Sequence, residues 1–247
     1  MSQRKTKRSA GFSLIEVLMV VLLLSIIVAA IFSQIDRAQV RYHVEDQKVD
    51  LTQQERDFID QFTRDLHQTG YPSPALYGNR LDLTSQRTAI GLWSISQTDL
   101  NLEADVDGDG IVDEITYHYD AGAGWAGPGP NPCPCLRRSS TLKQDGLLPW
   151  AQPAPVYYTQ VQNIIPVAGQ PIFQAYAFDG TVIDISAPKA LGSTTNLGNL
   201  NSDPTYELLH NIKNVRITFT TQAIGQDADA HKSVQVTMTG MARLPNN

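Results

Sequence analysis

The sequence predicts an α+β protein in which a long amino-terminal helix, transmembrane at first and then amphipathic, packs on a mostly antiparallel β head. Three patterns support this prediction. An apolar run fills residues 12–32, a helical amphipathic pattern continues over residues 33–70, and short strand-like segments between turn residues follow from Leu81 onward. At 247 residues the chain is long enough for one anchored head.

The apolar run at residues 12–32 is long enough to cross a membrane once. A helix of this length spans about 31 Å, which matches the hydrocarbon thickness of a bilayer. Residues 1–11 are basic and polar, which predicts a cytoplasmic amino terminus and an exported head. An ordinary secretory signal is the alternative, but it has a shorter apolar core and a small-residue cleavage site after that core. Here the polar break precedes the apolar run.

The amphipathic continuation and the head have recognisable boundaries. The helix is expected to end near His67, because Gly70 and Pro72 follow. Residues 71–247 form the head, in which Gly, Pro and polar residues predict irregular loops at 121–155 and 187–204. Strands are expected at residues 89–96, 114–119, 172–178 and 181–185, and residues 215–221 and 233–242 are expected to close the head as an antiparallel pair.

Charge and motif content argue against several classes of function. The formal charge is −6, and removing the four basic residues of 1–11 from the total of 19 leaves 15 basic against 25 acidic residues, net −10. Nucleic-acid binding is therefore not expected, since it needs clustered positive charge. The five histidines are scattered without zinc-ligand spacing, and no nucleophile motif occurs, so the chain is not expected to be an enzyme.

Glu16 is the anomaly within the apolar run. A carboxylate in a membrane-spanning segment is costly and usually functional. Its surroundings, Gly-Phe-Ser-Leu-Ile-Glu at residues 11–16, resemble the processing site of type IV prepilins and of the pseudopilins of type II secretion and competence systems. The resemblance implies cleavage after Gly11 by a prepilin peptidase, N-methylation of Phe12, and an assembly role for Glu16 as partner of a neighbouring subunit's amino terminus.

The resemblance also implies partners and location. A pilin-like subunit is stored in the inner membrane, in contact with lipid, as a single-pass protein with a periplasmic head. It then joins other major and minor pilins through the pilus assembly platform and becomes part of the pilus, or fimbrium. The sequence at residues 64–71 is similar to the segment that ends the long helix in PilW-type minor pilins and in J-type pseudopilins.

Three functions follow as hypotheses. The first is a PilW-type minor pilin that helps to initiate or cap a type IV pilus. The second is a J-like minor pseudopilin of a type II secretion system, which would share every feature named above. The third is a tip adhesion module that binds a surface through the loops at 121–155 and 187–204.

An acidic segment in the head predicts a structural calcium site. Asp105, Asp107 and Asp109 occupy alternate positions before Gly110, the pattern of calcium loops that converge carboxylates on one ion. The further expected ligands are the Ile111 carbonyl, Asp113 and, in place of the missing position-12 glutamate, Glu114. The alternative is a hairpin turn in which Asp and Gly serve the backbone.

The two cysteines, Cys133 and Cys135, are separated by one proline. They supply two ligands at most, too few for a zinc site on their own. A disulfide between them closes a tight ring, and an exported head would permit it. The sequence leaves open whether this pair is oxidised.

Overall fold

The computed structural model describes residues 13–77, 83–122, 133–193, 195, 200–226 and 233–246. The predicted cleavage site at Gly11 and Phe12 lies outside these residues. In chain order the elements are α1 (Leu14–Gln68), η1 (Pro74–Tyr77), β1 (Leu92–Ile95), β2 (Asp99–Ala104), β3 (Asp113–Ala121), β4 (Pro134–Leu142), η2 (Pro149–Ala151), β5 (Tyr158–Val161), β6 (Ile164–Ile165), β7 (Phe173–Tyr176), β8 (Val182–Ile183), β9 (Lys189–Ala190), η3 (Leu200–Ser202), α2 (Pro204–His210), β10 (Asn214–Gln226) and β11 (Ser233–Arg243).

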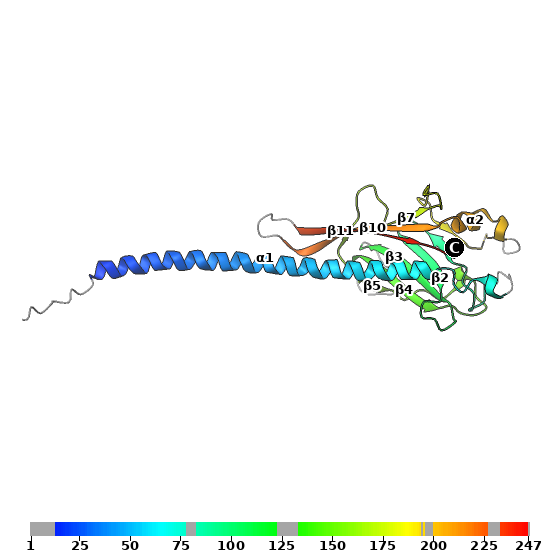
Figure 1. Cartoon of the computed structure of the whole chain (residues 1–247), viewed down its shortest axis with the longest axis horizontal. Coiled ribbons are helices and arrows are strands. Elements are labelled where there is room, and N and C mark those ends of the chain that lie inside the picture. The colour runs from blue at the N-terminus through cyan, green and yellow to red at the C-terminus, as the bar shows by residue number, and fades with distance from the viewer. Residues whose placement is uncertain are drawn as a thin grey trace, which may run out of the picture.

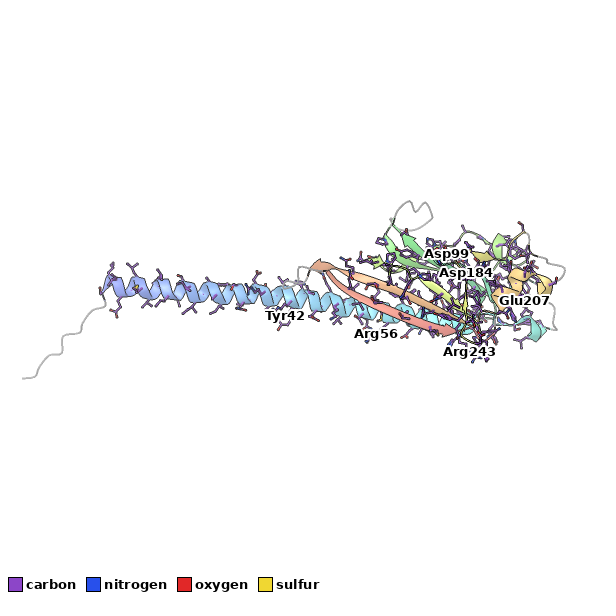
Figure 2. All side chains as sticks on the ribbon, turned by 90° about the horizontal axis from the view of Figure 1, so that it is seen from above. Tyr42, Arg56, Asp99, Asp184, Glu207 and Arg243 are labelled. Carbon is purple, nitrogen blue, oxygen red and sulfur yellow. A yellow bond between two sulfur atoms is a disulfide. The ribbon has the colours of Figure 1, made fainter. Side chains whose placement is uncertain are left out.

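Helix α1 is a single element of 55 residues whose two halves have different surroundings. From Leu14 to His43 every residue is exposed, and this part of the helix, which we call the stalk, extends away from the head (Figure 1). Figure 2 shows Tyr42 on the stalk and Glu207 at the opposite end of the head. α1 is also the one described helix long and apolar enough to cross a membrane.

The carboxyl-terminal half of α1 buries one face in the head. From residue 55 onward its buried residues recur at helical spacing: Glu55, Phe58, Phe62, Asp65 and Leu66, after a first buried residue at Val44. The helix ends where the sequence predicts, since Gly70 follows with φ +76°, a conformation that costs glycine little.

Two antiparallel sheets form the head. The first has the strand order β5-β4-β3-β2-β1-β9, and the second has the order β11-β10-β7-β8, with β6 also pairing with β10. The predicted closing pair is confirmed, because β10 and β11 pair from Asn214 opposite Arg243 onward. The fold as a whole is the predicted α+β arrangement of a long helix and an antiparallel head.

The core lies where α1 meets both sheets. The ring of Phe58 packs edge-on against Tyr117 of β3 at 5.9 Å and against Phe219 of β10 at 5.7 Å between centroids. Phe62 stacks on Phe173 of β7 at 6.2 Å. Since β3 belongs to one sheet and β7 and β10 to the other, these aromatic contacts join the helix to both layers.

Both predicted loops are wrong in part. Within 121–155, residues Pro134–Leu142 form β4, which lies between β3 and β5 in the first sheet. The polar sequence of β4 does not look like that of a buried strand. Arg137 can nevertheless be fully buried there, because Asp120 of β3 lies 2.9 Å away and neutralises its charge. Within 187–204, Lys189–Ala190 form the short edge strand β9, and Pro204 begins α2.

Candidate assembly helix and acidic loop

Glu16, the predicted assembly residue, lies in the first turn of α1. The amides of Glu16 and Val17 donate to the Ser13 carbonyl at 3.0 and 3.2 Å. The Glu16 side chain is exposed among apolar neighbours such as Ile15, which is 70% exposed. Among the described residues, none forms an ion pair or hydrogen bond with the Glu16 carboxylate.

This arrangement leaves the Glu16 carboxylate dependent on something outside the described chain. The start of a helix favours a negative charge, but only by about 0.3–1 kcal/mol at an exposed position. In an apolar surrounding a carboxylate needs a cation or a set of hydrogen-bond donors. Water or a lipid headgroup can supply this at the membrane surface, and in a protein assembly a neighbouring molecule must.

The two buried carboxylates in the head-packed half of α1, Asp65 and Glu55, have partners within the chain. Asp65 is buried and accepts hydrogen bonds from the Tyr117 hydroxyl at 2.6 Å, from Arg138 Nε at 2.7 Å and from Gln61 Nε2 at 2.9 Å. Burial, together with the adjacent Asp65 charge, holds the pKa of Tyr117 well above its usual value, so this hydroxyl stays a donor. The network ties α1 to strands β3 and β4.

Glu55, one turn before Phe58, is also fully buried. One of its carboxyl oxygens accepts a hydrogen bond from the Thr221 hydroxyl of β10, and the other, Oε2, has no partner among the described residues. Burial raises the pKa of Glu55 above its ordinary value, because desolvation disfavours the charged form. Glu55 therefore ties α1 to the second sheet, as Asp65 does to the first.

The acidic loop connects β2 to β3, and three of its predicted ligands converge. Oxygens of Asp105, Asp107 and Asp109 lie within 4.8 Å of one another. The Asp105 carboxylate also accepts from the amides of Gly108 and Gly110 at 2.7 and 3.0 Å. These backbone bonds fit both the calcium loop and the hairpin-turn interpretation, so the choice between them stays open.

The remaining predicted ligands are placed differently. Asp113 accepts weakly from the Val106 amide at 3.5 Å. Burial, and then repulsion from Asp107, Asp109 and Asp105, raise the pKa of Asp113 to about 6. Asp113 thus lies within electrostatic reach of the cluster, although its carboxylate is not among the converging three. The Ile111 amide donates a hydrogen bond to the Asp109 carboxylate at 2.7 Å. The Ile111 carbonyl stays a predicted ligand.

Glu114 faces a second buried charge group that sequence reasoning missed. It stands opposite Glu103 in the β2–β3 ladder, and Lys143 Nζ donates to Glu103 at 2.9 Å. Burial, and then repulsion from Glu103, raise the pKa of Glu114 to about 8. Two carboxyls and one ammonium therefore share this pocket of the head, and protonation of Glu114 leaves a neutral set.

Cys133 and Cys135 form a disulfide in the structure, with an S–S distance of 2.09 Å and Cα atoms 5.4 Å apart. Cys135 lies opposite Asp120 in the β3–β4 ladder, and Arg137 Nη2 is 3.7 Å from the Cys133 sulfur. The bridge lies at the start of β4. The sequence leaves the redox state of this pair open, and in the structure the two sulfurs are bonded.

One sequence signal could have found the buried acids of α1. Glu55 and Asp65 fall on the same helical stripe as Phe58 and Phe62, at spacings of three and seven residues from the aromatic rings. A charge on the apolar stripe of a helix needs a partner from the element packed against it. For Glu103 and Lys143 no local pattern exists, because strand pairing brings them together across 40 residues.

Comparison with known proteins supports the amino-terminal assignment. The family model described as the prokaryotic N-terminal methylation motif matches residues 6–32, which include the predicted leader end, Phe12 and Glu16. No curated protein and no solved structure gives a significant match to the chain. The motif indicates a type IV pilin-like protein, and the apolar part of the exposed stalk is consistent with a membrane anchor.

Proposed function

We propose that this chain is a minor pilin that helps to initiate or cap a type IV pilus. The observation that carries the proposal is the apolar part of the stalk, residues 14–32, which lies outside the head, falls within the methylation motif, and holds Glu16 as its one carboxylate, without a partner among the described residues. In the membrane its apolar surface contacts lipid, and in a filament the same surface packs against other stalks. The head, with its own core, is exported to the periplasm.

In this proposal Glu16 directs assembly. Removal of the leader after Gly11 exposes a cationic amino terminus on Phe12 of each processed subunit. A carboxylate and an ammonium attract strongly in a low-dielectric surrounding, and each relieves the desolvation cost of the other. Pairing of Glu16 with the amino terminus of a neighbour therefore fixes the register between stalks.

Mass spectrometry of the chain purified from its native membrane tests the processing step. We expect the mature protein to begin at N-methylated Phe12, and a Gly11→Leu variant to keep its leader. A mature protein that retains residues 1–11 would contradict the proposal, because assembly through the Phe12 amino terminus requires removal of the leader.

A deletion strain separates the pilus from the secretion system. Loss of surface pili with intact exoprotein secretion supports the minor-pilin assignment. Loss of secretion with intact pili would replace it with the J-like pseudopilin, because both assignments use the same stalk chemistry. Adhesion through the loops stays a prediction. Within the first of these loops, residues Pro134–Leu142 form strand β4, so this part is not a loop.

We also propose that the acidic loop binds calcium and thereby supports the β2–β3 connection. Support comes from the three carboxylates of Asp105, Asp107 and Asp109, which repel one another unless a cation or solvent separates them. Binding should weaken as pH falls through about 6, because protonation of Asp113 removes a nearby negative charge.

Calorimetric titration of the full chain in detergent with calcium chloride tests this site. We expect Asp107→Ala to abolish the binding heat. Asp179→Ala is the matched control, since Asp179 also accepts an amide two residues onward, from Thr181 at 2.9 Å, but is outside the converging three. A parent chain that gives no binding heat and no melting shift would establish the hairpin-turn interpretation.

A further inference from the structure

The four sheet edges of the head differ sharply in length. Among the described residues, β5, β9 and β8 end their sheets with strands of four, two and two residues. β11 ends the second sheet with eleven. Short edge strands offer little for another chain to pair with, and proteins commonly protect longer ones with charge, proline or a bulge.

β11 has almost none of these protections. Its sequence, Ser-Val-Gln-Val-Thr-Met-Thr-Gly-Met-Ala-Arg, contains no proline and no charge before Arg243. Its pairing with β10 is regular from Gln235 to Arg243, so no bulge twists this part of the edge away. The helix packs on one face of β11, as a Cβ on Gly240 would lie 2.8 Å from Ile59 Cδ1.

Alternate residues of β11 direct their backbone groups toward β10 and away from it, and one hydrogen bond shows which residues point outward. The Leu244 amide donates to the Lys213 carbonyl at 2.9 Å, so the even-numbered residues of β11 bond to β10. The odd-numbered residues therefore direct their amides and carbonyls outward: Gln235, Thr237, Thr239, Met241 and Arg243. None of these outward groups bonds to another described backbone group.

The same odd-numbered residues have exposed side chains on the sheet face turned away from α1. Met241 is 56% exposed. The hydroxyls of Thr237 and Thr239 pair with those of Thr220 and Thr218 on β10, at 2.8 and 3.3 Å. An added strand would find two β-branched threonines between the uncharged side chains of Gln235 and Met241, which suits cross-strand packing, and a charge only at Arg243.

The direction of β11 limits which strand can be added. β11 starts beside the stalk and runs toward the far end of the head, in the same direction as α1 (Figure 1). Antiparallel pairing of β11 with β11 of a second copy would therefore point the two stalks in opposite directions, which one membrane does not allow. Parallel self-pairing keeps both stalks together, but parallel ladders occur almost only in sheets covered on both faces.

We propose that the edge of β11 receives an extended strand from a different pilin-like subunit, antiparallel to β11, and so joins the two heads into one continuous sheet. The inference rests on the proposed function, because it assumes neighbours anchored in the same membrane. Backbone hydrogen bonds to residues 235–243 provide the affinity, and the uncharged Thr and Met side chains select a partner strand without charge at the facing positions.

Hydrogen exchange measured by mass spectrometry tests the ladder itself. The full chain is compared as a detergent-solubilised subunit and in the assembled complex isolated from the native cell. We expect the amides of Thr237, Thr239 and Met241 to exchange at least about 100-fold more slowly in the complex. Protection that is unchanged between the two states, in a chain that is processed and incorporated, would overturn the proposal and leave the proposed function standing.

A photo-crosslinking residue at position 235, compared with one at exposed Tyr158 on the short edge strand β5, identifies the partner. An adduct from position 235 with a second protein that begins at an N-methylated residue supports the proposal. An adduct with another copy of this chain overturns it. A chain that is neither processed nor incorporated would remove the proposed function and this inference together, and the mass of the amino terminus distinguishes that case.

Two variants at one residue separate backbone pairing from side-chain docking. Thr239→Pro removes an outward amide, which edge strands tolerate, whereas Thr239→Ala keeps that amide. We expect the position-235 adduct to disappear with proline and to persist with alanine. Adducts that survive in a Thr239→Pro chain would contradict strand addition. Melting of both variants as detergent-solubilised subunits checks that their heads are folded.

Discussion

The stalk and the head both hold carboxylates in apolar surroundings, but they satisfy them differently. In the head, Asp65 receives three donors and Glu103 receives Lys143. In the stalk, Glu16 has no partner among the described residues and is surrounded by exposed apolar side chains. Asp65 and Glu103 thus find cationic partners within the chain, whereas the stalk carries a charge whose partner must come from outside the described chain.

Replacement of Asp65 with alanine should cause the largest loss of unfolding free energy. It leaves Arg138 and the Tyr117 hydroxyl without their acceptor, and loss of one member of a buried pair costs about 3–5 kcal/mol. Thermal unfolding of the detergent-solubilised chain measures this cost. Asp60→Ala, on the exposed face of the same helix, should stay within about 0.5 kcal/mol of the parent. Equal losses in the two variants would contradict a special role for Asp65.

Glu114 should make the head less stable as pH rises. Its pKa of about 8 in the fold lies above the ordinary 4.5, so the folded state holds a proton that the unfolded state loses. The stabilisation is fully present below pH 4.5 and is lost as pH rises through about 8. Glu114→Gln should flatten the melting profile over this window, whereas exposed Glu45→Gln should leave it unchanged. A parent chain with a flat profile would contradict the buried-acid account.

Gly240→Ala tests how closely the helix approaches the second sheet. The new methyl would meet Ile59 Cδ1 at 2.8 Å and Cγ2 at 3.0 Å, so we expect a loss of about 1–3 kcal/mol in unfolding free energy. Combining it with Ile59→Ala should relieve part of this loss, which a double-mutant cycle would show. Gly192→Ala, with no atom within 4 Å of its Cβ position, is the control. If Gly240→Ala cost the same unfolding free energy with and without the Ile59 side chain, the strain would not come from the contact with Ile59.

Local patterns predicted the parts of the structure that local chemistry determines. Apolar length, the amphipathic stripe and Gly70 defined α1, and alternation in residues 215–221 and 233–242 defined the β10–β11 pair. β4 was missed because its buried Arg137 is neutralised by Asp120, a residue supplied by strand pairing. The three aspartates of the acidic loop were found from their spacing, whereas Glu103 and Lys143 depend on contacts between distant segments.

The stalk's dependence on a partner is tested most directly by Glu16→Ala in the full chain. The variant should be processed after Gly11, remain in the membrane and melt at the same temperature as the parent, because no described residue of the head contacts Glu16. Its incorporation into filaments, measured by immunoblotting of sheared surface fractions, should be lost. Normal incorporation of a correctly processed variant, or a lowered melting temperature of its head, would contradict the account.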